Sequence, residues 1–201
     1  MSELTELCQQ MMTCQACDLA KSRRTVVPGE GDENARIVFI GEAPGWHEDQ
    51  QGRPFVGPAG QFLDELLASV GLRRSQVYIC NVIKCRPPDN RDPLPAEIEA
   101  CRSWLDQQLA SIKPQMIVTL GRYSMARYFP GKNISRTHGT HFKRDGIIYL
   151  AMYHPAAALH QQSLRLSIQE DMQKIPHLLA LLDAIPEEKQ PEDKAQQLNL
   201  F

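Results

Sequence analysis

Residues 35–45 read Ala-Arg-Ile-Val-Phe-Ile-Gly-Glu-Ala-Pro-Gly, an apolar run that leads into a glycine-bounded turn. A short apolar run followed by glycine is typical of a buried β-strand. Further β-rich runs alternate with helical patterns, the strands at 77–83, 115–121 and 147–153 and the helices at 59–70, 95–112, 122–129 and 164–182. Such alternation indicates a parallel sheet with helices on both faces. We therefore predict an α/β fold, a three-layer α/β/α sandwich with a central four-stranded parallel sheet.

Chemically distinctive residues lie where the predicted strands end. Glu42 follows the first strand in a Gly-rich turn, Asn81 lies at the end of the second, Gly121 and Arg122 follow the third, and His154 follows the fourth. Ligands bind outside the carboxyl ends of the strands in open parallel sheets. Taken singly, each residue has a plainer interpretation, as a turn glycine, a strand-end amide or a loop histidine. Together they predict a binding site at one edge of the sheet.

Four of the six cysteines are spaced as metal ligands could be. Cys14 and Cys17 form a C-x-x-C, and Cys85 and Cys101 lie far downstream. The sequence shows no signal segment and no membrane span, so we expect a cytoplasmic protein, in which C-x-x-C indicates metal or redox chemistry. The wide second spacing favours an iron–sulfur cluster, while zinc stays open and no strand precedes the C-x-x-C as a redox pair would need. Cys80, inside an apolar run, is interpreted as a core thiol.

The composition indicates one globular domain followed by a polar tail. The chain has 201 residues, of which 42% are apolar and 23% charged, and a net charge of −2, so no overall basic character points to nucleic acid. Residues 122–144 carry lysines and arginines but no acid, which is typical of a phosphate-binding surface or of a solvated face. We predict a folded domain at 1–185 and a disordered tail at 186–201.

Six motifs in this order resemble those of the family 4 uracil-DNA glycosylases, the iron–sulfur branch of that superfamily. They are the C-x-x-C of Cys14 and Cys17, Gly41-Glu-Ala-Pro-Gly45, Gly52-Arg-Pro-Phe-Val-Gly-Pro-Ala-Gly60, Asn81-Val-Ile-Lys-Cys-Arg-Pro-Pro88, Cys101-Arg-Ser-Trp-Leu105 and His154-Pro-Ala-Ala157. The resemblance implies removal of uracil from DNA. It also implies a [4Fe–4S] cluster held by Cys14, Cys17, Cys85 and Cys101.

The resemblance further implies how the base is recognised. A uracil flipped out of the duplex would stack on Phe55. Asn81 would accept a hydrogen bond from uracil N3–H and donate one to O4, whereas cytosine presents the reverse pattern and leaves buried groups unpaired. The backbone from Gly41 to Ala43 would add amide contacts to the base.

Bond cleavage leaves negative charge on the departing base, and stabilising that charge is the protein's largest contribution. The resemblance implies that His154 donates a hydrogen bond to uracil O2, in a protonation state that the sequence leaves open. It also implies that Glu42 positions the attacking water or offsets charge on the sugar. The best-known branch of the superfamily has an aspartate in place of Ala43 and a bulky aromatic in place of Gly45. Water handling and thymine exclusion therefore differ here.

We expect Arg86 and Arg122 to contact DNA phosphates and Leu159 to fill the space that the flipped base leaves. Because hydrolysis of a glycosidic bond needs no electron, the cluster is interpreted as scaffolding, with redox sensing as the alternative. Some cluster-containing relatives crosslink to the abasic sugar through a histidine, but residues 86–97 contain none. We therefore predict a turnover enzyme and not an inactive or crosslinking DNA-binding protein.

The chain ends in Gln197-Leu-Asn-Leu-Phe201, which resembles the Q-L-x-L-F peptide that docks bacterial DNA-processing proteins on the sliding clamp. The alternative is an apolar end that folds back on the domain. We expect a bacterial protein that is a monomer, associates with the nucleoid when bound to DNA, and has uracil-containing DNA and the sliding clamp as partners.

Overall fold

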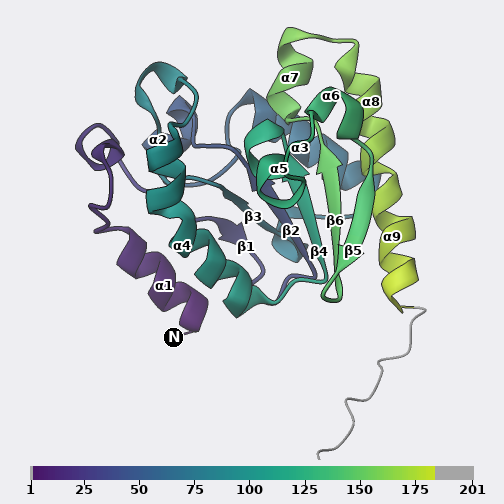
Figure 1. Cartoon of the computed structure of the whole chain (residues 1–201), viewed down its shortest axis with the longest axis horizontal. Helices are drawn as coiled ribbons and strands as arrows, with labels where there is room; N and C mark the ends of the chain where they lie inside the picture. The colour runs from purple at the N-terminus through teal and green to yellow at the C-terminus, as the bar shows by residue number, and fades with distance from the viewer. Residues whose placement is uncertain (1, 184–201) are drawn as a thin grey trace, which may run out of the picture.

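The computed structural model describes residues 2–183, which form a layered α/β domain (Figure 1). Its sheet has six strands within this range, in the order β1-β3-β2-β4-β6-β5. The four central strands are parallel, namely β3 (Tyr78–Asn81), β2 (Ile37–Gly41), β4 (Met116–Leu120) and β6 (Ile147–Met152). The predicted α/β sandwich with its four parallel strands is confirmed.

Two antiparallel edge strands were not predicted. Strand β1 (Glu30–Gly31) pairs with β3, and β5 (His141–Arg144) pairs with β6. β1 has only two residues, and β5 is polar and mostly exposed, so neither carries the apolar run or the alternation that identifies a strand in sequence. Strands β2, β3 and β4 are buried throughout, as expected for a sheet covered on both sides.

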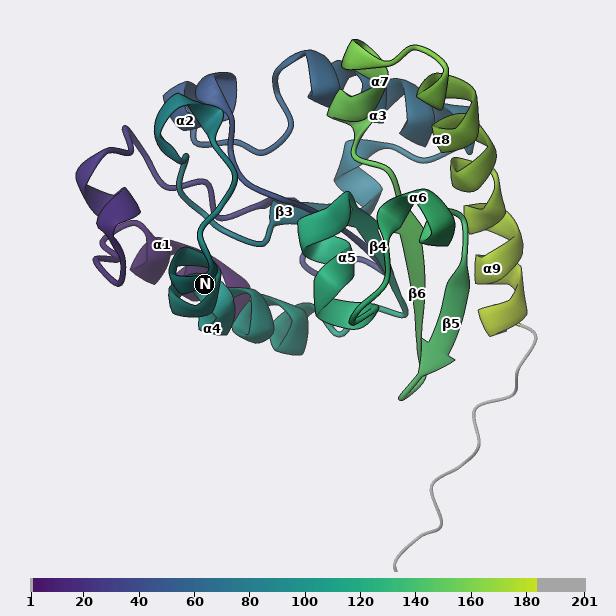
Figure 2. The ribbon, with the colours of Figure 1, turned by 45° about the horizontal axis from the view of Figure 1, so that its top comes forward.

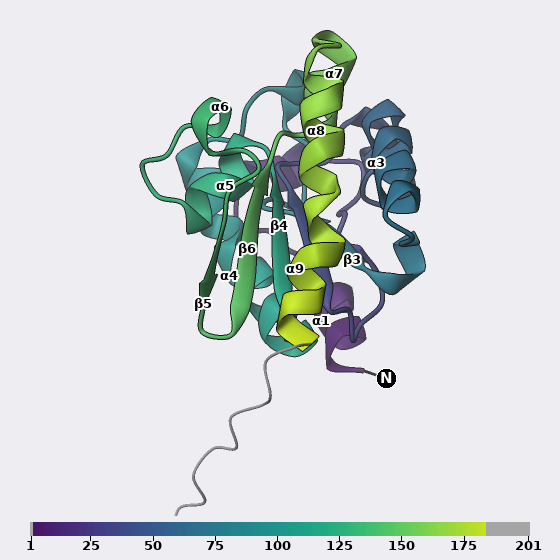
Figure 3. The same ribbon diagram turned by 90° about the vertical axis from the view of Figure 1, so that its right-hand side faces the viewer.

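Helices cover the two faces of the sheet (Figures 1 and 3). One face carries α1 (Glu3–Met11), α4 (Pro95–Ile112) and α5 (Arg122–Tyr128), and α1 lies along α4 (Figure 2). The other carries α3 (Pro58–Ser69), α7 (Pro155–His160), α8 (Leu164–Met172) and α9 (Lys174–Asp183). Short elements complete the range, namely α2 (Trp46–Gln51), α6 (Ile134–Thr137) and the 3₁₀ turns Asp18–Lys21, Arg74–Gln76 and Pro88–Asn90.

The last predicted helix, 164–182, is in fact two helices, α8 and α9. Pro176 lies in the first turn of α9, where its missing N–H and its ring disfavour a bond to the carbonyl of Met172, four residues earlier. Proline is tolerated at a helix start, so the chain ends one helix and begins another.

No helix between residues 2 and 183 is both long and apolar enough to cross a lipid bilayer. The predicted tail at 186–201, with the peptide expected to bind a sliding clamp, lies outside the described residues, so the division at residue 185 stays a prediction.

Candidate active site and cysteine centre

The carboxyl ends of the central strands bring the predicted site residues to one edge of the sheet, the edge that carries α7 in Figure 1. Gly41 of β2 is paired directly with Asn81 of β3. Beyond β4, the backbone N–H of Gly121 donates to the Met152 carbonyl at 2.9 Å, which ties that turn to the strand leading into His154. The edge predicted from sequence is therefore formed.

Gly41 leaves room for the side chains of Asn81 and Phe55. A Cβ at this position would overlap Asn81 Oδ1 and lie 2.6 Å from Phe55 Cζ. Both side chains are buried, and Asn81 Oδ1 has no hydrogen-bond partner among residues 2–183. An unpaired buried acceptor costs about 1–3 kcal/mol, and a ligand that donates a hydrogen bond would remove that cost.

Phe55 lies in a loop, and its ring is buried against His154 with the two ring centroids 5.4 Å apart. Its backbone has a positive φ of 52°, which is strained for a non-glycine residue. Arg74 holds this conformation by donating to the carbonyls of Phe55 at 3.0 Å and Pro54 at 2.6 Å. Gly60 of α3 lies so close that a Cβ would overlap the Phe55 carbonyl oxygen.

Glu48 joins the turn after β2 to the Phe55 loop, a role the sequence analysis missed. Its carboxylate accepts from the backbone N–H groups of Val56 at 2.9 Å, Gly57 at 3.0 Å and Gly45 at 3.1 Å. Gly45 is the N-cap of α2, and a glutamate three residues after an N-cap is a recognisable sequence signal. The glutamate thus sets the spacing between two walls of the site.

His154 carries a neutral imidazole ring. Burial lowers the pKa of its imidazole to about 4, and the nearby Glu48 opposes this shift. Its Nδ1 accepts from the backbone N–H of Ala156 at 3.1 Å, so the single proton of the neutral ring lies on Nε2. The structure therefore decides the protonation state that the sequence left open.

Glu42 is a half-buried carboxyl group with a strongly raised pKa. Burial and, to a smaller extent, Asp92 raise its pKa and Arg122 lowers it, so that the pKa is about 7. Asp92 and Arg122 form an ion pair at the rim of the site. A carboxyl group that titrates near neutral pH is suited to accept a proton.

The predicted DNA-binding residues lie at or near the surface. Arg122 is exposed and pairs with Asp92, while Arg86 is half-buried and donates to Asn90 Oδ1 at 2.7 Å. Leu159 lies near the end of α7 with 49% of its surface exposed. Their contacts with DNA stay predictions.

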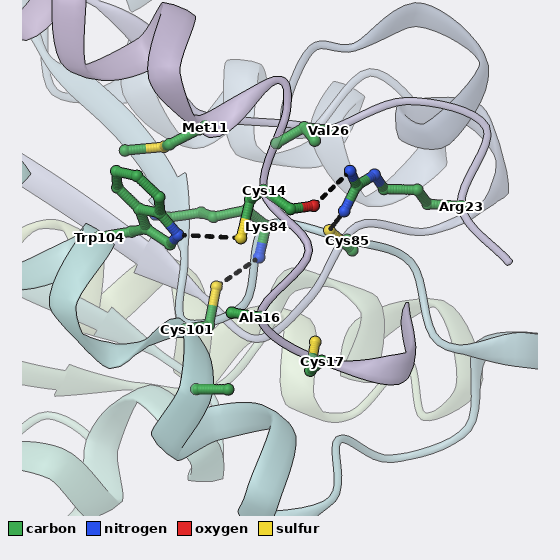
Figure 4. A pocket seen from close by; sticks show the side chains of 11 residues that line it. Met11, Cys14, Ala16, Cys17, Arg23, Val26, Lys84, Cys85, Cys101 and Trp104 are labelled. Atoms are coloured by element: carbon green, nitrogen blue, oxygen red, sulfur yellow. Dashed lines mark hydrogen bonds between the residues drawn. The ribbon is translucent and has the colours of Figure 1, made fainter. Parts of the chain in front are cut away.

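Cys14, Cys17, Cys85 and Cys101 line one cavity between the N-terminal segment, the loop after β3 and α4 (Figure 4). Three of the sulfurs receive an N–H group at 3.3 Å, and the donors are Trp104 Nε1 to Cys14, Arg23 Nη1 to Cys85 and the Lys84 backbone to Cys101. N–H donors aimed at sulfur stabilise thiolates and tune the centres that thiolates bind.

The cysteine cavity is a costly place for a bare thiolate. Burial raises the pKa of Cys85 and raises that of Cys101 to about 11. Between residues 2 and 183, no three or more His, Cys, Asp or Glu side chains converge closely enough for a single metal ion. Arg23 and Trp104 were not predicted as partners of this centre, although Trp104 follows Cys101 by one helical turn.

Comparisons with known proteins show the family of this chain. Residues 28–179 match the model of the uracil DNA glycosylase superfamily. The type-4 uracil-DNA glycosylase of Archaeoglobus fulgidus is 46% identical over 89% of this chain and 94% of the relative. That of Thermotoga maritima is 44% identical over 86% and 93%, whereas a type-5 uracil-DNA glycosylase of Thermus thermophilus is 35% identical over 64% and 68%. The chain therefore belongs to the uracil-DNA glycosylase superfamily and, within it, to the type-4 family.

We predict that Gly60→Ala destabilises the protein by about 1–3 kcal/mol, because the new Cβ would push the Phe55 carbonyl away. The direction of this change in stability is informative, since a glycine-to-alanine substitution within a helix otherwise stabilises a protein by up to about 1 kcal/mol. Urea unfolding would measure the effect, with Gln61→Ala at the exposed next position as the control. Wild-type stability of Gly60→Ala would contradict the close approach.

We also predict that His154 stays neutral, with its proton on Nε2, from pH 8 down to about 5. NMR of ¹⁵N-histidine-labelled protein would show this, and His154→Asn would assign the signal. Since the unfolded chain takes up this proton near 6.5 and the folded site near 4, stability should fall as the pH decreases between these values. A His154 signal that titrates near 6.5 would contradict the assignment.

Proposed function

We propose that this protein excises uracil from DNA by hydrolysing the N-glycosidic bond, which leaves free uracil and an abasic site for base excision repair. The observation that carries the proposal is the buried, unpaired Asn81 Oδ1, which lies beside Phe55. The absence of a side chain at Gly41 leaves room for both residues. The relatives named uracil-DNA glycosylase support the same activity.

The residues around Gly41 account for base recognition. A uracil would place its N3–H against Asn81 Oδ1, and the Asn81 amide would donate to O4. Cytosine has an acceptor at N3 and would leave Asn81 Oδ1 unpaired, so its rejection is steep. The Phe55 ring would stack on the base, and its strained backbone is held in advance by Arg74, so little ordering of this loop is needed on binding.

The titratable groups account for bond cleavage. As the bond breaks, negative charge develops on the base, and the neutral Nε2–H of His154 would donate a hydrogen bond to O2. Glu42, with a pKa of about 7, would orient water as a carboxylate and take up its proton as the water attacks the sugar. The backbone of Gly41 to Ala43 would border the base on the same side.

We propose that the cysteine centre holds a [4Fe–4S] cluster bound by Cys14, Cys17, Cys85 and Cys101. Four cysteines around one cavity, with N–H groups donated to three of the sulfurs, suit a cluster, because thiolates are the ligands of its irons. When bound, the cluster would supply a crosslink between distant segments, since the hydrolysis transfers no electron.

The surface groups fit a DNA path beside the pocket. Arg86 and Arg122 would neutralise phosphates, and the exposed Leu159 would occupy the stack that the flipped base leaves. A bacterial cytoplasmic location, a monomeric state and docking of Gln197-Leu-Asn-Leu-Phe201 on a sliding clamp remain proposals from the sequence.

We predict that Asn81→Ala lowers uracil excision about a hundredfold or more, because N3–H and O4 both lose their partner. Asn81→Asp should begin to act on cytosine, since its carboxyl group can pair with the cytosine edge. The assay is strand scission by alkali after incubation with a single-uracil oligonucleotide, and a single-cytosine oligonucleotide is the control. Absence of scission by the wild type would refute the proposed function.

We predict that single-turnover excision increases about tenfold between pH 6 and pH 8, as the Glu42 carboxyl group loses its proton through a pKa of about 7. Glu42→Gln should be slower and should lose this dependence. An exposed matched control is Glu33→Gln, which should keep the wild-type profile. A pH dependence that persists in Glu42→Gln would assign the titration to another group.

A further inference from the structure

Lys84 is a buried lysine between the candidate active site and the cysteine centre. Only 1% of its surface is exposed, and it lies three residues after Asn81 and directly before Cys85. The ion pairs formed within residues 2–183 do not include it. A buried ammonium group without a counter-charge is costly, so the position demands an explanation.

Lys84 contacts both sites directly. Its Nζ donates a hydrogen bond to the backbone carbonyl of Asn81 at 2.7 Å. Its backbone N–H donates to Cys101 Sγ at 3.3 Å, and the residue lines the cysteine cavity (Figure 4). Lys84 thus bonds to the end of β3, which carries the Asn81 amide, and to one wall of the cysteine cavity.

The cysteine centre is the place where a counter-charge for Lys84 would arise. Four thiolates would bring negative charge to the cavity, and the charge around a thiolate-bound cluster sets its reduction potential and stability. Arg23 is the other cation in the cavity wall, and it donates to Cys85 Sγ, whereas the remaining walls come largely from apolar side chains such as Met11 and Val26. In such surroundings a nearby ammonium group is weakly screened, so its charge acts strongly on the thiolates.

We propose that Lys84 is a positioning residue that balances the charge of the cysteine centre and, through the same side chain, fixes Asn81 for base recognition. This inference rests on the proposed function. Lys84 would then link the cysteine centre to base recognition, because its charge acts on the centre and its hydrogen bond holds Asn81. If Lys84 merely filled space, a methionine of similar length and shape would replace it without loss, since neutral replacements of buried charges are often tolerated.

The test compares Lys84→Met with Lys21→Met in the cluster-loaded protein. Lys21 is the matched control because it lies four residues after Cys17 but is exposed and paired with Asp18. Lys84→Met should release iron to bathophenanthroline about tenfold faster and show a lower reduction potential, because a positive charge that stabilises the added electron is gone. Lys21→Met should match the wild type in both measurements.

Uracil excision then tests the link to Asn81. Lys84→Met should lower kcat/KM about tenfold, but it should cause no further loss in an Asn81→Ala background, because it acts through that residue. If Lys84→Met does not fold, Lys84→Gln, which keeps an N–H donor and lacks the charge, carries the iron and potential measurements.

Wild-type iron release and potential in the neutral variants would overturn the counter-charge role. Additive losses of excision in the double variant would overturn the action through Asn81. A wild-type protein that leaves uracil in place would instead refute the proposed function, and the iron and potential measurements would still decide the role of Lys84 at the cysteine centre.

Discussion

The parallel pairing of β2 with β3 is the interaction on which the rest of the site depends. It sets Gly41 beside Asn81, and it continues beyond the strands, where Val82 and Ile83 donate to the carbonyls of Gly41 and Glu42 at 3.1 and 3.2 Å. One ladder of backbone hydrogen bonds therefore holds the turn after β2 against the segment that leads to the cysteine centre. A shift of register by one residue would turn Asn81 to the opposite face of the sheet.

Burial is the common cause of the chemistry that the site offers. It keeps His154 neutral, brings the pKa of Glu42 to about 7, and leaves Asn81 Oδ1 without a partner. Each of these states is unfavourable for the folded protein alone, and each becomes useful when a base with matching donors and acceptors enters. Fixed dipoles in a site that excludes water also stabilise developing charge more strongly than water does.

The cysteine centre joins segments that are remote in sequence. It connects the chain after α1 with the loop after β3 and with α4, and Arg23 adds a bond to the Cys14 carbonyl at 2.6 Å. Closing so long a loop restricts the unfolded chain most strongly, so a bound cluster would stabilise the fold while taking no part in the hydrolysis. Lys84 contacts both this centre and Asn81.

Local patterns in the sequence were sufficient for the four parallel strands, for most of the helices and for the edge where Gly41, Asn81 and His154 meet, because strand period, helix period and strand-end position are properties of neighbouring residues. The edge strands β1 and β5 were not predicted because β1 is short and β5 is polar. The break between α8 and α9 was not predicted because the helical pattern continues across it. The positive φ of Phe55, the bridging role of Glu48, the tautomer of His154 and the burial of Lys84 were decided by the tertiary structure alone. Each depends on desolvation or on a hydrogen bond set by the packing of the folded chain, and residue order does not record either.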